Sequence, residues 1–364
     1  MKPLDGLLVL DLTRLLPGPF CASLLRSWGA RTVKVEDLEA GDYLREVHPV
    51  WFAHLNAGAL SVGLDLKHPR GREVFLRLAA TADVVLEGFR PGVMERLGLA
   101  YETLKAINPR LVLVSLSGYP RESELAGRAG HDLTYLARSG LLSLMGEPPP
   151  VQLADLTAGW AGAAGALAAV LAARAKGQGV HVDASLFGAA CSLGALLTAE
   201  VRAGAAPTRE SLPLAGALPC YSVYETSDGG RVALGALEPK FWRAFCSLVG
   251  RSEWGERGSD PALRPEVAAL FRLRSSAEWA VLSAGSDCCL GPVVSLSANG
   301  LPEAPLMFGG TTWNCDSPAP SRGAHTLELL KQIGYSEQEI GALAAEGLIP
   351  GDAKREQGGT VRLT

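Results

Sequence analysis

Three ionisable residues of this sequence stand where a helix is expected to begin. His131 follows glycines in AGRAGHDLTYLA, and Asp155, in VQLADLTAGW, directly precedes a long uncharged stretch. Backbone N–H groups at a helix start attract anions, so a base there could act on a substrate whose oxygen becomes negative. Glu238, in GALEPKFW, precedes a proline at a third helix start. The alternative for all three is a helix cap, which His131 would form together with Asp132.

Arginines are the candidates for binding an anionic group. Arg90 and Arg96 lie in EGFRPGVMERLGL, and Arg128 lies shortly before His131. Arg90 follows a predicted strand and should project at the carboxyl edge, where parallel sheets bind ligands, unless it is simply solvated. The sequence has no P-loop, no HExxH, no GxSxG, no GxGxxG after the first strand and no Cys/His spacing typical of a metal site. We therefore expect neither a metal nor a dinucleotide cofactor of the usual type.

The elements that must position these residues alternate strands with helices. Short apolar runs predict strands at 7–12, 32–36, 84–88 and 111–119. Helical periods lie between them, near 18–29, 70–80 and 91–106. This βαβ rhythm predicts an α/β fold whose parallel sheet is buried on both faces. The stretch 156–173 carries no charge, but it consists mostly of Ala and Gly, which favours a buried helix over a membrane span.

The pattern changes in the second half of the chain. A strand at 181–185 and a helix of small residues lead into linker-like composition at 203–219. Two strands around Asp228-Gly229-Gly230 and an amphipathic helix at 239–249 then indicate a smaller α+β domain. Closing helices at 325–345 suit the surface of the first domain. We expect a large domain at 1–202, completed by 323–364, and a small domain with linkers at 203–322.

Composition excludes several classes of protein. The 364 residues carry 34 Lys and Arg against 38 Asp and Glu, and 48% are hydrophobic. A disordered polyelectrolyte is therefore excluded, and the acidic balance argues against binding to nucleic acid. Seven Cys without a CxxC pair favour a reducing, cytoplasmic setting. An apolar N-terminal stretch interrupted by Asp5 and Asp11 does not read as a secretory signal.

Taken together, these segments resemble the family III (CaiB/BaiF-like) CoA-transferases and, within them, the α-methylacyl-CoA racemases. The resemblance covers nearly the whole chain, including GLLVLDLTRLLPGPFCASLLRSWGARTVKVEDLEAGDYLR, ADVVLEGFRPGVMERLGL, AGHDLTYLARSG, GQGVHVDASLFGAA and VALGALEPKFW. It implies a large Rossmann-like domain and a smaller α+β domain. It also implies an obligate homodimer of two interlinked chains.

The resemblance assigns roles to the three candidates. It implies that His131 and Asp155 are two bases on opposite faces of the α-carbon of an acyl-CoA thioester, and that Glu238 backs the His. In the transferases of the family the same Asp is a nucleophile and the His is typically absent, so His131 favours epimerisation of 2-methylacyl-CoA thioesters. CoA transfer through Asp155 is the first alternative, and a catalytically weak CoA-thioester-binding paralogue is the second.

The same resemblance implies where CoA, as part of the substrate, would bind. The expected contacts are Leu64, Lys67, Gly88, Phe89, Arg90, Arg96, Arg128, Gly130, Asp132 and Tyr135. The sequence departs from its relatives at two places. Asp37 stands where they carry an Arg, and NAGALS, with Ala57, Ala59 and Leu60, replaces a basic loop. We expect CoA binding to be altered there. The stretch 295–322 has no recognisable family pattern, which leaves the acyl chain undefined.

Overall fold

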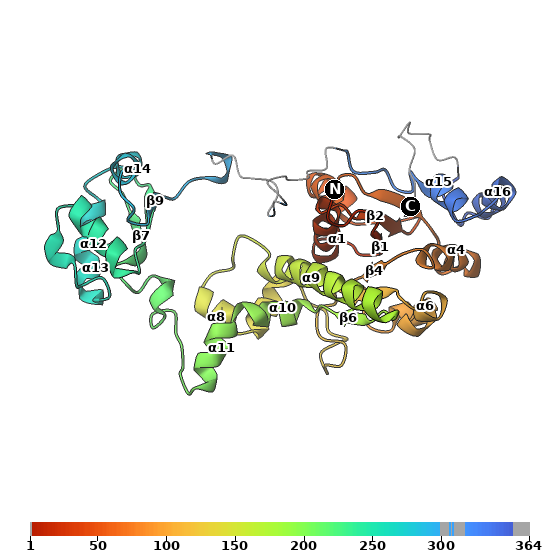
Figure 1. Ribbon diagram of the computed structural model, residues 1–364, viewed down its shortest axis with the longest axis horizontal. Coiled ribbons are helices and arrows are strands. Elements are labelled where there is room, and N and C mark those ends of the chain that lie inside the picture. The colour runs from red at the N-terminus through yellow and green to blue at the C-terminus, as the bar shows by residue number, and fades with distance from the viewer. Residues whose placement is uncertain (1, 299–305, 307, 309–316, 352–364) are drawn as a thin grey trace. The chain divides into compact units, whose positions relative to one another are not determined.

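The chain divides into two compact units in the computed structural model (Figure 1). The larger comprises Met1–Ala195 and Glu303–Thr364, and the smaller comprises Leu196–Pro302. The structure describes residues 2–298, 306, 308 and 317–351. Most of the 295–322 stretch, and the end of the segment expected to complete the large domain, therefore lie outside the described residues. Each unit is described by itself below.

The large unit is built on a six-stranded parallel sheet in the order β3-β2-β1-β4-β5-β6. Its strands are Leu60–Gly63 (β3), Arg31–Glu36 (β2), Leu8–Asp11 (β1), Val84–Glu87 (β4), Val112–Ser115 (β5) and His181–Asp183 (β6). The α/β prediction is confirmed, because the six strands are parallel and β1, β4 and β5 are buried along their whole length. The sequence had not indicated β3, since its residues LSVG form too short and too mixed a run to stand out.

One face of the sheet is covered by α1 (Pro17–Ser27) and α9 (Leu153–Lys176). The residues that α9 buries are all Ala, Gly or Val, so it packs closely on α1 and β5. A methyl group at Gly159 would lie 2.9 Å from the carbonyl oxygen of Pro17 in α1. By length and composition α9 could cross a membrane, a test that soluble core helices also pass. Its small residues belong to the core cluster, which confirms the expected buried helix.

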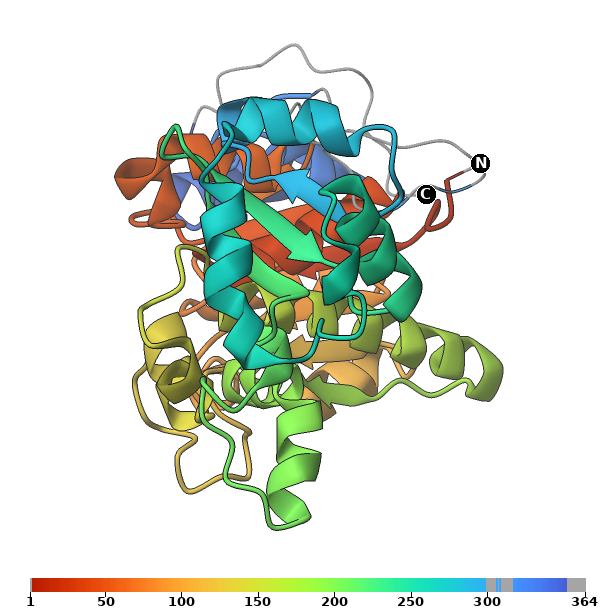
Figure 2. The same cartoon turned by 90° about the vertical axis from the view of Figure 1, so that its left-hand side faces the viewer.

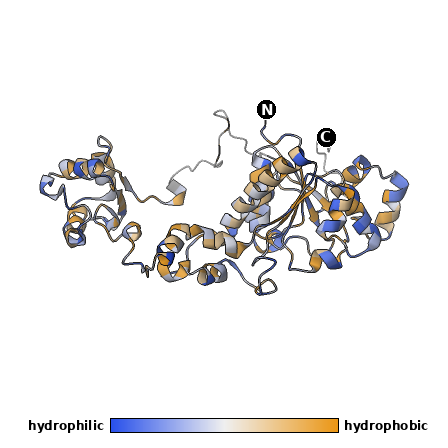
Figure 3. Ribbon diagram, turned by 60° about the horizontal axis from the view of Figure 1, so that its bottom comes forward, coloured by the Kyte–Doolittle hydropathy of each residue, from blue (hydrophilic) through white to orange (hydrophobic). Residues whose placement is uncertain are grey.

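The opposite face is covered by α4 (Pro69–Ala79), α6 (Tyr101–Ile107), α15 (Thr326–Gln332) and α16 (Glu337–Ala345). Their apolar sides join the core while charged residues face outward, and Figure 3 shows the contrast with the apolar strands. The single helix expected at 91–106 is instead two, α5 (Val93–Arg96) and α6. Gly98 between them has φ +69°, a left-handed conformation that ends the first helix.

Shorter helices lie between these elements. They are α2 (Leu44–Val47), α3 (Pro49–Asn56), α7 (Asp132–Arg138), α8 (Leu141–Met145) and α10 (Leu186–Leu193). The next helix, α11 (Ala195–Arg202), belongs to the smaller unit from Leu196 onward. The strand expected over 111–119 ends at Ser115, and the chain continues as a loop to α7. This loop and α7 place His131 beyond the carboxyl end of β5.

The small unit contains the antiparallel sheet β7 (Tyr221–Glu225), β8 (Arg231–Gly235) and β9 (Leu290–Pro292). The predicted hairpin around Asp228 is confirmed. Helices α12 (Pro239–Leu248), α13 (Arg264–Phe271) and α14 (Ser276–Ser283) pack around the sheet (Figure 2). Its 3₁₀ turns are Pro213–Ala215, Ser252–Trp254, Pro261–Leu263 and Leu296–Ala298. An aromatic cluster that includes Trp242, Phe271 and Trp279 fills the core.

Candidate active site

The N-termini of α7 and α9 are joined by one hydrogen bond. The backbone N–H of Asp155 donates to Oδ1 of Asp132 over 3.0 Å. Asp155 is therefore not an N-cap: Gln152 occupies that position, and Asp155 is the third residue of α9. Asp132 supplies the capping carboxylate instead, from the first turn of another helix. This bond brings Asp155 close to the residue that precedes Asp132, which is His131.

The carboxyl group of Asp155 lies in an environment that disfavours its charge. Its Oδ1 atom is buried and has no hydrogen-bond partner among the described residues. Burial, and next the negative charge of Asp132, raise the pKa of Asp155 to about 7. Near neutral pH, Asp155 therefore exists in comparable amounts as acid and as carboxylate, so it can either donate or accept a proton.

His131 occupies the N-cap position of α7, and its side chain is exposed. Its backbone N–H donates to Oγ1 of Thr134 over 3.0 Å, and that hydroxyl in turn donates to the His131 carbonyl oxygen over 2.7 Å. These two bonds fix the backbone at the start of α7. The imidazole is thus held on a defined backbone at the solvent side of the two helix N-termini.

Tyr135 follows His131 by one turn of α7, with its backbone N–H donating to the His131 carbonyl oxygen over 3.3 Å, and it is 4% exposed. Its ring packs edge-on against Tyr119 at 5.3 Å between centroids. A methyl group at Gly130 would lie 2.7 Å from the Tyr135 ring, so glycine is required there for this packing. Burial, followed by the Asp155 charge, raises the pKa of Tyr135 to about 12, while the Arg90 guanidinium acts in the opposite direction. Tyr135 is thus a neutral hydroxyl at neutral pH, under the opposing electrostatic influence of Asp155 and Arg90.

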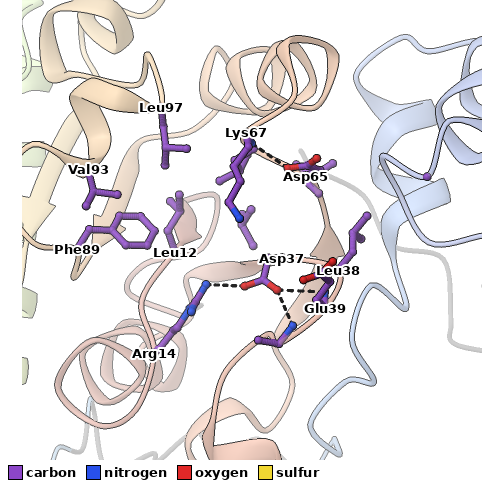
Figure 4. A pocket seen from close by; sticks show the side chains of 15 residues that line it. Leu12, Arg14, Asp37, Leu38, Glu39, Asp65, Lys67, Phe89, Val93 and Leu97 are labelled. Atoms are coloured by element: carbon purple, nitrogen blue, oxygen red, sulfur yellow. Dashed lines mark hydrogen bonds and ion pairs between the residues drawn. The ribbon is translucent and has the colours of Figure 1, made fainter.

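A pocket of about 510 Å³ opens at the carboxyl edge of the sheet (Figure 4). Its walls come from the loops that follow β1, β2, β3 and β4. Among the expected CoA contacts, Leu64, Lys67 and Phe89 line it. The Lys67 side chain points into the pocket toward Asp37 (Figure 4). The pocket therefore lies at the edge of the sheet where parallel sheets form ligand sites.

Asp37 anchors the loop on one side of this pocket. Its Oδ1 accepts the backbone N–H groups of Glu39, Ala40 and Gly41 at 2.7 to 3.1 Å. Its Oδ2 accepts from the Arg14 guanidinium over 2.6 Å. Burial alone would raise the pKa of Asp37, but these N–H donors and Arg14 outweigh it and hold the pKa below its usual value. The carboxylate is therefore charged at neutral pH.

A buried ion cluster near the carboxyl ends of β1 and β2 was not recognised from the sequence. Lys34 in β2 is 1% exposed, and its Nζ lies 3.0 Å from Asp42 and 3.6 Å from Asp11. The Lys34 ammonium also donates to the carbonyl oxygen of Thr13 over 3.1 Å. The cluster ties the loops after β1 and β2 together and so shapes the pocket. The sequence signal that could have predicted this cluster is the presence of Asp11 and Lys34 within strands that are otherwise mostly apolar.

The remaining predicted residues are dispersed. Gly88, Arg90 and Arg96 follow β4, while Arg128 is exposed in the loop before α7. Glu238 belongs to the small unit, where it is exposed at the N-cap position of α12 and its side chain forms no capping bond. The structure thus joins His131, Asp132, Asp155, Gly130 and Tyr135 in one site. Their chemical roles stay predictions.

Comparison with known proteins adds a second line of evidence. The model of CoA-transferase family III matches residues 4–299. Human α-methylacyl-CoA racemase is 33% identical, over 95% of this chain and 97% of its own length. Acetyl-CoA:oxalate CoA-transferase of Acetobacter aceti is 32% identical, over 83% of each chain. A CaiB/BaiF family protein from Brucella suis superposes with a TM-score of 0.78 at 27% identity, over 91% of this chain and 99% of its own.

Proposed function

The chain belongs to CoA-transferase family III, and we propose that it inverts the C2 centre of 2-methylacyl-CoA thioesters by two-base proton transfer. The observation that carries the proposal is the hydrogen bond between Asp132 and Asp155, which joins the N-termini of α7 and α9 where His131 and Asp155 stand, together with a pKa of Asp155 near 7. Inversion needs one base that is neutral or anionic and one acid that is protonated in the same turnover. With a pKa near 7, Asp155 can act as the acid in one direction of the reaction and as the base in the other.

The proposed reaction begins with removal of the C2 proton. In one direction the His131 imidazole takes this proton, and the electrons of the C–H bond move into the thioester to form an enolate. The protonated Asp155 then delivers its proton to C2 from the opposite face, and the enolate collapses to the thioester of inverted configuration. In the other direction the Asp155 carboxylate is the base and the His131 imidazolium is the acid.

The enolate oxygen needs stabilisation, because a positioned base alone supplies only about 10²–10⁴-fold. The N–H of Asp155 is already bound to Asp132. The first-turn N–H groups of Leu153 and Ala154 in α9 are the ones we assign to the oxyanion. Asp132 is then a positioning residue: it orients the start of α9 and keeps the pKa of Asp155 high.

We assign the CoA part of the substrate to the carboxyl-edge pocket. Lys67 and Phe89 line the pocket. Arg90, Arg96 and Arg128 are the candidates for further phosphate contacts. We also propose an obligate homodimer, as the family resemblance implies, and a cytoplasmic location, which seven Cys without a CxxC pair favour.

Deuterium exchange tests the proposal. The protein is incubated with a 2-methylacyl-CoA of one configuration in deuterium oxide, and C2 is followed by NMR and by chiral analysis of the released acid. We expect deuterium at C2 together with inversion, and at least about a 10²-fold loss in the His131→Ala variant. His325→Ala, which lies at the start of α15, is the control and should exchange at the parent rate. Absence of exchange across a panel of acyl chains would contradict the proposal.

The same site supports a second candidate function, CoA transfer between carboxylic acids. The observation in its favour is the unpartnered Oδ1 of Asp155, an oxygen free to act as a nucleophile. The carboxylate would attack the thioester carbonyl, expel the CoA thiolate and form a mixed anhydride. The thiolate would then attack the Asp155 carbonyl, which releases the acid and leaves an aspartyl-CoA thioester. Borohydride or hydroxylamine trapping on Asp155, found by mass spectrometry, would favour transfer, and an unmodified Asp155 would count against it.

A further inference from the structure

The carboxyl-edge pocket holds more negative than positive charge. The ionisable side chains that line it are the carboxylates of Asp37, Glu39 and Asp65 and the cations of Arg14 and Lys67. Arg14 is already paired with Asp37 at 2.6 Å. Lys67 is therefore the lining cation that points into the pocket without a carboxylate partner in the part of the chain that the structure describes. One ammonium can take a pyrophosphate oxygen, but a further phosphate held inside the pocket would lie among carboxylates, because Arg90, Arg96 and Arg128 are not among the residues that line it.

The position of Asp37 in the sheet indicates which ligand group it faces. The strand order β3-β2-β1-β4-β5-β6 is that of nucleotide-binding doubly wound sheets, and Asp37 is the first residue after β2. In such sheets a carboxylate after this strand accepts a hydrogen bond from a ribose hydroxyl, whereas an arginine nearby accommodates a phosphate on that ribose. The charge at this position therefore discriminates between a free and a phosphorylated ribose.

We propose that this pocket binds the adenosine diphosphate end of the substrate with both ribose hydroxyls free, so that the chain prefers dephospho-CoA thioesters to CoA thioesters. The inference rests on the proposed function and specifies its substrate class. A phosphate monoester carries about −1.5 to −2 charge at pH 7 and is repelled by the three carboxylates, whereas a hydroxyl donates to one of them. Asp37 is the specificity-determining residue, because its carboxylate also pairs with Arg14 and so keeps that guanidinium from binding a phosphate.

Equilibrium binding of the unacylated nucleotides tests the preference. Titration calorimetry would compare dephospho-CoA with CoA, and AMP with adenosine 3′,5′-bisphosphate, two pairs that each differ by one 3′-phosphate. We expect the unphosphorylated member of each pair to bind at least about tenfold more tightly, a difference of about 1.4 kcal/mol. Equal or tighter binding of CoA, or no binding of either ligand at millimolar concentration, would overturn the inference.

The Asp37→Asn variant assigns the preference to one charge. Its amide oxygen can still accept the backbone N–H groups that hold the loop, while Arg14 is released to meet a phosphate. We expect the preference to shift toward CoA by about tenfold or more. Asp5→Asn removes the same charge outside the pocket and should leave the preference unchanged. An unchanged preference in Asp37→Asn would refute the role of Asp37, and the comparison in the parent protein stands even where the variant does not fold.

The deuterium-exchange assay separates this inference from the proposed function. Exchange with both thioesters, but with higher kcat/KM for the CoA form, would overturn the inference and support the function. A nucleotide preference without exchange on either thioester would contradict the function and leave the pocket's preference established. Faster exchange with the dephospho-CoA thioester supports both.

Discussion

At the scale of single residues, the proposed function makes stability and activity both depend on the protonation of Asp155. Its pKa is about 7 in the folded protein and near the ordinary value of 3.8 in the unfolded chain. Between these values the folded state binds more protons, so stability falls as pH rises from 4 to 7 and is constant above. A salt-bridged carboxylate shows the opposite pH dependence, because its pKa is lowered in the folded state. A raised pKa that costs stability at neutral pH is typical of functional sites.

The Asp155→Asn variant tests this directly. It resembles the neutral acid at every pH, so we expect it to be more stable than the parent by roughly 2–4 kcal/mol at pH 8 and nearly equal to it at pH 4. Chemical denaturation at both pH values measures the difference. An equal effect at the two pH values would mean that the carboxyl group is not perturbed by the fold.

Asp132 makes a separate prediction. Asp132→Asn removes the charge that helps to raise the pKa of Asp155, while the amide oxygen can still accept the Asp155 N–H. Turnover that uses Asp155 as the acid falls as pH rises through about 7 in the parent, and this limb should move to lower pH in the variant. Asp183→Asn, on the last residue of β6, is the matched control. A limb that stays in place, with only the rate reduced, would leave Asp132 a purely structural role.

At the level of residues, the sequence predicted that His131 and Asp155 stand at helix starts, and the structure places His131 at the N-cap of α7 and Asp155 in the first turn of α9. Their pairing as two bases was implied by the family resemblance and stays a prediction. The Asp132 bond to Asp155 could not be foreseen, because it joins residues 23 positions apart on two helices. The pairing of Arg14 with Asp37 was hidden for the same reason, since their strands meet only in the sheet.

At the scale of elements, the close packing of α1 against α9 fixes the position of α9, whose first turn carries Asp155. Gly159→Ala would place a methyl group 2.6 Å from the Phe20 ring and 2.9 Å from the Pro17 carbonyl oxygen. We expect a loss of about 1–3 kcal/mol in unfolding free energy, because the two helices must separate. Gly341→Ala, in the middle of α16 with open space around it, should gain up to about 1 kcal/mol. Urea denaturation compares them, and equal effects would show that the contact is loose.

The strands were easier to predict than the ends of helices. Apolar runs that are buried on both faces identify β1, β2, β4 and β5 without help from their neighbours. β3 escaped because four residues with Ser and Gly resemble a loop until β2 pairs with them. The break between α5 and α6 depends on the left-handed conformation of Gly98. A helical spacing of apolar residues carries no information about the φ angle of a glycine within it.

At the scale of the whole molecule, the proposed dimer has a simple physical test. Sedimentation equilibrium should give about twice the 38.2 kDa of one chain at every concentration down to the nanomolar range, as expected for interlinked chains. Denaturation midpoints should rise with protein concentration if unfolding and dissociation are coupled. A monomeric mass with full activity would contradict the proposal.

The central claim is that two bases on opposite faces of C2 exchange one proton each. The most direct measurement is where deuterium appears early in the reaction, when unlabelled 2-methylacyl thioester of one configuration is incubated in deuterium oxide. Two bases predict deuterium in the inverted product while the recovered substrate stays unlabelled, and the product label should be lost in both His131→Ala and Asp155→Asn. Equal early labelling of substrate and product would indicate a single shared base and contradict the account.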